Sequence, residues 1–98
     1  MGPEKLFETK VKNYLRSLGI WHVKFFANGY TRRGIPDILA CVNGKFVAIE
    51  VKSENGKPSA LQDKNIEMIQ ESGGIAMVLY PDDFDDFKAM IESLRKEP

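Results

Sequence analysis

An Asn-Gly dipeptide at positions 43 and 44 is the feature that most constrains how this chain folds. It separates two apolar runs, DILACV over 37–42 and KFVAIEVK over 45–52. Because both turn residues tolerate positive φ, Asn-Gly between apolar runs is a strong signal for a two-residue β-hairpin. The numbers of residues paired across such a hairpin add to 87. Asp37 is therefore predicted to lie directly opposite Glu50.

Helical and strand patterns alternate along the chain. Apolar residues recur at helical spacing in three segments, and the other apolar segments are rich in β-branched and aromatic residues. The predicted elements are helices over 3–18, over 59–72 and from Asp82 or Asp83 onward, and strands over 20–26, 37–42, 45–52 and 75–80. The order αβββαβα predicts an α/β fold in which helices flank a mixed sheet.

Burial can also be predicted from these patterns. The run over 75–80 is apolar throughout, which indicates a strand covered on both faces. On the helix over 59–72, Leu61, Ile66 and Ile69 are expected to face inward. Cys41 lies in an apolar strand and is expected to be a small core residue.

Length and composition exclude several classes of protein. A chain of 98 residues allows one domain, which we expect to span 1–98. No apolar run approaches the ~18 residues of a membrane span, and the N-terminus lacks the apolar stretch of a signal peptide. We therefore expect a cytoplasmic protein without a membrane partner. A single cysteine, Cys41, and a single histidine, His22, exclude a disulfide framework and a His or Cys zinc cluster.

The predicted pair of Asp37 and Glu50 indicates a metal-binding site. Their Cβ atoms are expected ~5 Å apart, where like charges destabilise a sheet unless a cation binds between them. Two carboxylates without a histidine favour Mg²⁺ or Mn²⁺ over zinc. Such an ion polarises a phosphoryl oxygen and lowers the pKa of a bound water, which suits phosphodiester hydrolysis. Lys52 projects from the same sheet face as Glu50, whereas Val51 points to the other face.

A plainer interpretation of the same residues is an Asp in a turn and a Glu-x-Lys pair on a solvated strand. The apolar neighbours of Glu50, in VAIEVK, argue against it because they place this carboxylate beside the core.

These residues also carry a family resemblance. Gly34-Ile35-Pro36-Asp37, followed thirteen positions later by Glu50-Val51-Lys52, resembles the PD-(D/E)xK nuclease superfamily. The continuation GKPSALQ over 56–62, with Gly-Gly at 73 and 74, resembles its VRR-NUC (virus-type replication-repair nuclease) branch. Stand-alone members of that branch are similar in fold to the archaeal Holliday junction resolvases, which act as dimers on four-way junctions.

The resemblance implies a restriction-endonuclease-like core, αβββαβ plus a C-terminal helix, and a metal-dependent endonuclease. It implies that Asp37, Glu50 and the backbone carbonyl of Val51 bind Mg²⁺ or Mn²⁺. It also implies that Lys52 is the catalytic lysine.

Two further site residues follow from the resemblance. It implies that Gln62 lies near the attacking water, although Ser59-x-x-Gln62 is also a capping box, and both roles stay open. The family places a metal-binding glutamate on its first helix. Of Glu4 and Glu8 we choose Glu8, because it flanks the apolar stripe, although a glutamate there is also favourable with the helix dipole.

A DNA-contacting surface is expected around the loop over 28–34. Arg32 and Arg33 precede Asp37, and the residues expected to complete the surface are Lys24, Lys57 and Tyr30, which could stack on a base. No element typical of base-specific reading is present, so we expect structure-specific cutting of four-way junctions or flaps by a homodimer. The alternatives are a nicking endonuclease on ordinary duplex and a catalytically idle DNA-binding subunit. The facing acids argue against the idle subunit.

The formal net charge is zero, but it is unevenly distributed. Residues 1–80 carry eleven Lys or Arg against eight Asp or Glu, whereas residues 81–98 carry three against six. The sequence thus predicts a basic body and an acidic final helix that faces away from DNA.

Overall fold

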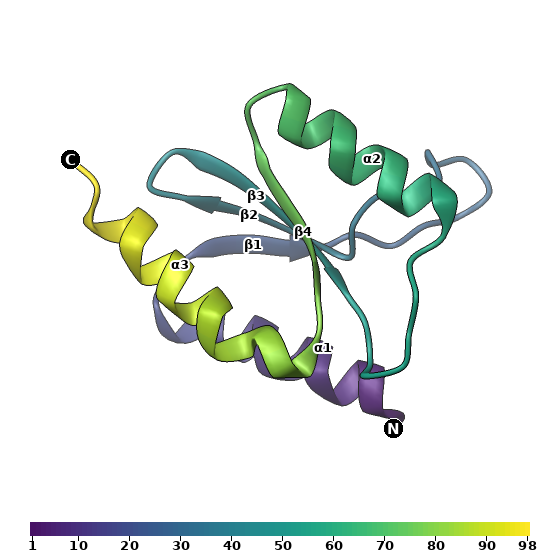
Figure 1. Ribbon diagram of the computed structural model, residues 1–98, viewed down its shortest axis with the longest axis horizontal. Coiled ribbons are helices and arrows are strands. Elements are labelled where there is room, and N and C mark those ends of the chain that lie inside the picture. The colour runs from purple at the N-terminus through teal and green to yellow at the C-terminus, as the bar shows by residue number, and fades with distance from the viewer.

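A four-stranded sheet with helices on both faces forms the structure, a computed structural model that describes residues 1–98 (Figure 1). The elements are helix α1 (Pro3–Ser17), strands β1 (Trp21–Lys24), β2 (Ile38–Val42) and β3 (Lys45–Val51), helix α2 (Ala60–Glu71), strand β4 (Ile75–Leu79), the 3-10 turn η1 (Pro81–Asp83) and helix α3 (Phe84–Lys96). The predicted element order is confirmed, and the fold is a restriction-endonuclease-like α/β core. The first strand is shorter than the predicted 20–26, because the chain leaves the sheet soon after Lys24.

The sheet order is β1-β2-β3-β4, with β4 parallel to β3 and the other neighbours antiparallel. Across the hairpin Ile38 pairs with Ile49, which is the predicted register. The two turn residues have φ of 51° at Asn43 and 81° at Gly44, in the left-handed region that this dipeptide tolerates. Asp37 therefore enters the sheet opposite Glu50, as expected.

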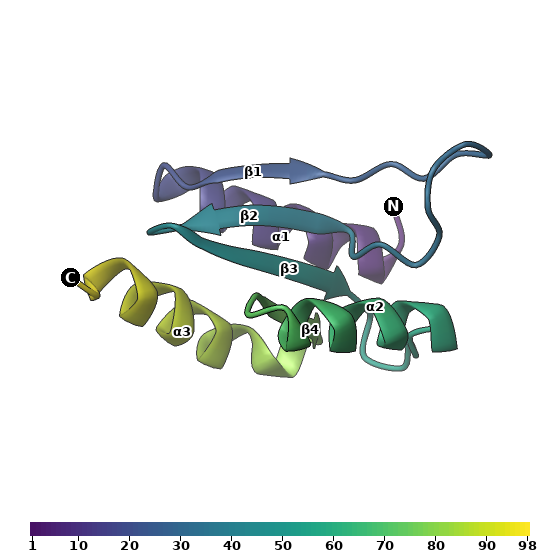
Figure 2. The ribbon, with the colours of Figure 1, turned by 90° about the horizontal axis from the view of Figure 1, so that it is seen from above.

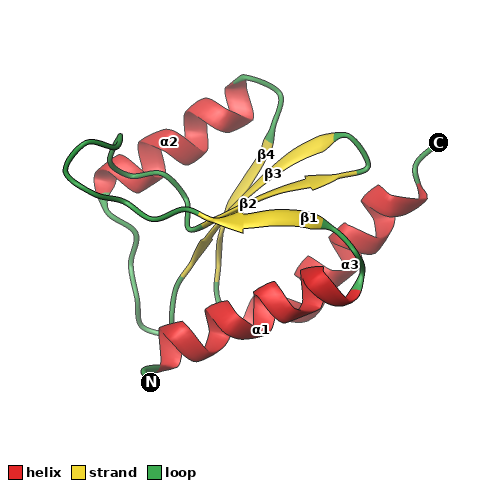
Figure 3. Ribbon diagram, turned by 180° about the vertical axis from the view of Figure 1, so that it is seen from behind, coloured by secondary structure: helices red, strands yellow, loops and turns green.

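Helices α1 and α3 cover one face of the sheet and α2 covers the other (Figures 1 and 3). The larger core lies against α1 and α3, where Val47, Ile49 and Val51 of β3 are buried. The smaller core lies under α2 and contains Ala48, Ile66 and Ala76. Residues of β4 belong to both cores, so its predicted coverage on both faces is confirmed.

Helix α2 covers only the β3–β4 half of its face (Figure 2). Apolar side chains of β1, of β2 and of the start of β3 on the same face are left wholly or partly uncovered. We call this surface the open face; it consists of Trp21, Val23, Leu39, Cys41 and Phe46. Trp21 is 64% exposed. The prediction that Cys41 is a core residue is wrong, because its strand position lies beyond the reach of α2. Leu61 is also exposed rather than inward, because it lies at the start of α2, away from the small core.

The C-terminal helix is attached to the β2–β3 hairpin. The side-chain amide of Asn43 donates to the carbonyls of Leu94 (2.9 Å) and Glu97 (2.8 Å). At its other end α3 follows η1. Asp83 occupies the expected capping position, but its side chain makes no capping hydrogen bond. None of the helices combines the length and the apolar character that crossing a membrane requires.

Candidate active site

The sequence-predicted acids meet at the end of the sheet where β1 and β3 finish and β2 begins (Figure 1). Asp37 directly precedes β2, and Glu50 lies next to the last residue of β3. The backbone N–H of Val51 donates to Asp37 Oδ2 at 3.0 Å, which ties the two strand ends together. The hairpin register thus holds one carboxylate beside the other.

Glu50 is the most enclosed acid of the site, with 1% of its surface exposed. Its Oε2 lies 3.3 Å from Lys52 Nζ and accepts a hydrogen bond from Gln62 Nε2 at 3.1 Å. Its Oε1 is buried and has no hydrogen-bond partner. A buried acceptor without a partner is rare and costly, so this oxygen marks a position where a cation or a donor would be favoured.

The electrostatics of Glu50 agree with this geometry. Burial raises the pKa of Glu50 to about 7, the charge of Asp37 adds to the rise, and Lys52 opposes it. The carboxyl is therefore partly protonated near neutral pH. A divalent cation at this position would favour its ionised form.

Gln62 makes the contacts expected from a capping box. Its Oε1 accepts from the backbone N–H of Ser59 at 2.8 Å, while Ser59 Oγ accepts from the Gln62 N–H at 3.1 Å. The amide group of the same side chain reaches Glu50, so the cap also presents Gln62 to the acid pair. The capping role is confirmed, and a role near the attacking water stays a prediction.

On the first helix Glu8 faces the site and Glu4 is exposed. Glu8 Oε1 lies 2.7 Å from Lys24 Nζ, and Oε2 lies 3.0 Å from Lys5 and 3.3 Å from Lys12. Burial alone would raise the pKa of Glu8, but the hydrogen bonds from Lys24 and Lys5 outweigh burial and lower it to about 2. Glu8 is thus an ionised, fully paired acid.

Lys24, predicted from the sequence to contact DNA, lies between two of the carboxylates; its role in DNA binding stays a prediction. Its amino group is 3.2 Å from Asp37 Oδ1 as well as 2.7 Å from Glu8. Lys24 reaches these acids because it lies on the face of β1 that packs against α1. With this lysine between the acids, no group of three or more His, Cys, Asp or Glu side chains lies close enough together to hold a metal ion.

The other predicted DNA-contacting residues are exposed and form no ion pair with the acids described above. Tyr30 and Arg33 are exposed on the loop that follows β1. Lys57 lines a cleft of about 480 Å³ together with Asp82 and Asp83. The start of the acidic segment therefore lies beside a predicted phosphate contact, which differs from the expected separation. The reason is that β4 runs parallel to β3 and ends next to it.

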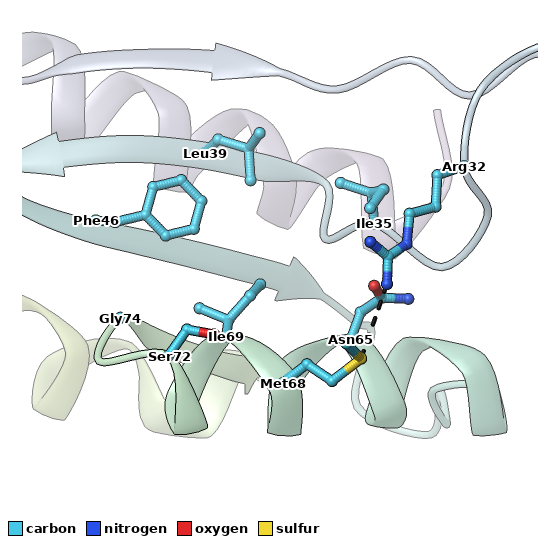
Figure 4. Close-up of a pocket in the computed structure, with 9 residues that line it drawn as sticks. All are labelled: Arg32, Ile35, Leu39, Phe46, Asn65, Met68, Ile69, Ser72 and Gly74. Atoms are coloured by element: carbon cyan, nitrogen blue, oxygen red, sulfur yellow. Dashed lines mark hydrogen bonds between the residues drawn. The ribbon is translucent and has the colours of Figure 1, made fainter.

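A separate groove of about 430 Å³ lies between α2 and the open face (Figure 4). Leu39 and Phe46 form its sheet side, and Met68 lies on its helix side. Arg32 Nη2 lies 3.8 Å from Met68 Sδ across one end. The groove is mostly apolar and contains none of the predicted catalytic acids, so it is not the reaction centre.

Two residues hold the loop that leads into Asp37; sequence reasoning missed Asn65 and named Gly34 only as part of a motif. Asn65 is buried, and its amide donates to the carbonyls of Arg33 (3.2 Å) and Leu61 (2.9 Å). Gly34 has φ of +77°, and a Cβ there would come within 2.8 Å of both Asn65 and Leu61. These contacts fasten the loop that leads into Asp37 onto α2. The available signals were the glycine before Ile-Pro-Asp and an amide beside the inward-facing Ile66.

The family model described as archaeal Holliday junction resolvase (Hjc) matches residues 4–77, which include Glu8, Asp37 and Glu50. The chain belongs to the archaeal Holliday junction resolvase family. Hjc is a PD-(D/E)xK-type nuclease family, so the predicted superfamily is confirmed, whereas the match does not name the VRR-NUC branch. No relative was found among curated proteins.

Proposed function

We propose that the protein is a divalent-metal-dependent endonuclease that hydrolyses phosphodiester bonds in branched DNA such as four-way junctions or flaps. The observation that carries the proposal is the buried, unpartnered Oε1 of Glu50 beside Asp37, in a chain of the resolvase family. We further propose that it acts in the cytoplasm and that its nearest branch is VRR-NUC.

The donor set fits a hard divalent cation. Asp37, Glu50 and the Val51 carbonyl offer only oxygen atoms, which suits Mg²⁺ or Mn²⁺. The buried Oε1 of Glu50 has no protein donor to satisfy it. When bound, such an ion stabilises negative charge on phosphoryl oxygen and eases deprotonation of water. We keep Glu8 as a candidate ligand, although its oxygens are already paired with lysines.

The side chains around Glu50 have distinct tasks in this proposal. Lys52 holds a positive charge 3.3 Å from Glu50 Oε2, where it can neutralise charge that develops on the phosphate in the transition state. Gln62 donates to the same oxygen and so orients the Glu50 carboxylate. Asp37 is oriented in turn by the Val51 N–H. Arg32, Arg33, Tyr30 and Lys57 would hold the DNA strands near this centre.

The homodimer is supported by the open face. On the open face Trp21, Val23 and Phe46 are exposed to solvent, next to the apolar groove beside α2. A second copy of the chain would cover it and present two active sites to a symmetric junction. Cys41 reports on this interface, because it is the only cysteine and lies on the open face. We expect a maleimide to label Cys41 more slowly as protein concentration rises; concentration-independent labelling of a sedimenting monomer would contradict the dimer.

Cleavage assays test the activity. A four-way junction, a flap, a plain duplex and a single strand are incubated with the protein and Mg²⁺ or Mn²⁺. We expect cutting of the branched substrates, and its loss in Asp37→Asn and Lys52→Ala with DNA binding retained. The exposed Lys64→Gln on α2 is the matched control. Activity retained by Asp37→Asn would refute the site.

Two other results would favour the alternatives. Equal cutting of plain duplex would indicate a nicking endonuclease, and metal-independent binding without any cutting would indicate an idle subunit.

A further inference from the structure

Lys24 is the one cation that contacts two acids of the site. Its Nζ lies 2.7 Å from Glu8 Oε1 and 3.2 Å from Asp37 Oδ1, and its side chain is 18% exposed. Surface ion pairs contribute little, but a largely buried ammonium between two carboxylates is strongly bound in place. The lysine therefore joins α1 to the start of β2 across the end of the sheet.

Asp37 has no uncommitted oxygen while this contact is made. Its Oδ2 accepts from the Val51 N–H, and its Oδ1 faces Lys24. Glu8 does not depend on Lys24 in the same way, because Lys5 and Lys12 also contact it. Removal of the Lys24 charge would thus leave Glu8 paired and leave Asp37 beside Glu50 without a cation at Oδ1.

We propose that Lys24 is an internal counter-ion, which holds Asp37 and Glu8 together when no metal is bound and competes with a divalent cation for Asp37. The inference rests on the metal site of the proposed function. An ammonium and a divalent cation sharing one carboxylate repel each other, so binding of either weakens the other. Lys24 is accordingly a positioning residue that sets the metal affinity of the site.

This role differs from that of a phosphate contact in what its loss would do. A lysine that only binds DNA contributes to DNA affinity, and its removal leaves metal affinity unchanged. A counter-ion that competes with the metal makes metal binding weaker, so its removal makes metal binding tighter. A gain in affinity also cannot result from a damaged fold, which would lower it.

The test compares Lys24→Gln with Lys64→Gln, which removes the same charge from an exposed position on α2. Lys24→Gln keeps a donor for one carboxylate, and Lys24→Met removes the donor as well. Binding of Mn²⁺ without DNA is measured by titration calorimetry, and thermal unfolding is measured in EDTA. We expect both Lys24 variants to bind Mn²⁺ at least about fivefold more tightly than wild type, with Lys64→Gln unchanged. In EDTA we expect the Lys24 variants to melt below Lys64→Gln.

The outcomes separate the inference from the function. Equal Mn²⁺ affinity in the Lys24 and Lys64 variants, or weaker affinity in folded Lys24→Gln, would overturn the counter-ion role and leave the metal site intact. Absence of Mn²⁺ binding in wild type and all variants would overturn both. Reduced DNA affinity with unchanged metal affinity would return Lys24 to the phosphate-contact role.

Discussion

Glu8 and Glu50 are both buried carboxylates at the same end of the sheet, yet their surroundings shift their pKa values in opposite directions. Three lysines contact Glu8, and its pKa is about 2. Glu50 has one lysine, one amide and an unpartnered oxygen, and its pKa is about 7. Burial acts to raise the pKa of both acids; at Glu8 the hydrogen bonds from lysines outweigh it, and at Glu50 the single lysine does not. We infer that Glu50 needs a further cation to ionise fully, whereas Glu8 needs none.

The largest expected effect is on the rate of DNA cleavage, when the charge of Glu50 or of Glu8 is removed by substitution with glutamine. Glu50→Gln should lower the single-turnover rate of junction cleavage by at least about a hundredfold, because it removes a proposed direct ligand. Glu8→Gln should lower it by only about tenfold, because lysines already pair with both oxygens of this candidate ligand. A Glu8→Gln loss as large as that of Glu50→Gln would erase the distinction between the two acids.

Metal affinity should depend on pH through Glu50 alone. Because a proton on Glu50 competes with the metal, Mn²⁺ should bind about tenfold more tightly at pH 8 than at pH 6 for a carboxyl with a pKa near 7. Glu8→Gln should keep this dependence, since Glu8 is ionised over the whole range. Titration calorimetry at the two pH values measures it, and equal affinities would contradict the raised pKa.

The stability of the metal-free protein should respond to the two acids in opposite pH windows. The pKa of Glu8 is lowered from 4.5 to about 2, so its contribution is complete above pH 4.5 and is lost as the pH falls toward 2. The pKa of Glu50 is raised from 4.5 to about 7, so the folded state loses stability as the pH rises from 4.5 through 7. In EDTA the melting temperature should fall as the pH drops below 4.5 and should fall again as the pH rises from 4.5 through 7. Glu50→Gln should remove only the fall at higher pH, and Glu8→Gln only the fall at lower pH.

The smallest effect concerns the loop that delivers Asp37 to Glu50. Asn65→Ala removes the amide bond to the Arg33 carbonyl and should lower the free energy of unfolding by about 1–3 kcal/mol, with reduced cleavage. Gln70→Ala is the matched control, because Gln70 donates to the carbonyl of Ala76, near the start of β4 and away from the site, at 2.9 Å. Chemical denaturation and cleavage rates measure both. Equal activity losses in the two variants would show that the Asn65 contact does not position the site.

The sequence was sufficient to predict the acid pair, because a two-residue turn determines which residues face each other along a hairpin. It was also sufficient for the capping box, which is a local pattern. It could not show the position of Lys24, since its partners are 13 and 16 residues away. Asp37 meets Lys24 through the pairing of β1 with β2, and Glu8 meets it through the packing of α1. Cys41 and Leu61 were misassigned for a related reason: periodicity tells which face a residue is on, but not how far a helix extends across that face.

The same turn has a second attachment. Asn43, which sets the pairing of Asp37 with Glu50, also binds the last carbonyls of α3. The end of α3 thus holds the hairpin turn in place, at the end of the sheet away from the acids. A truncation ahead of Leu94 removes no proposed catalytic group, yet it releases the residue on which the alignment of both acids depends.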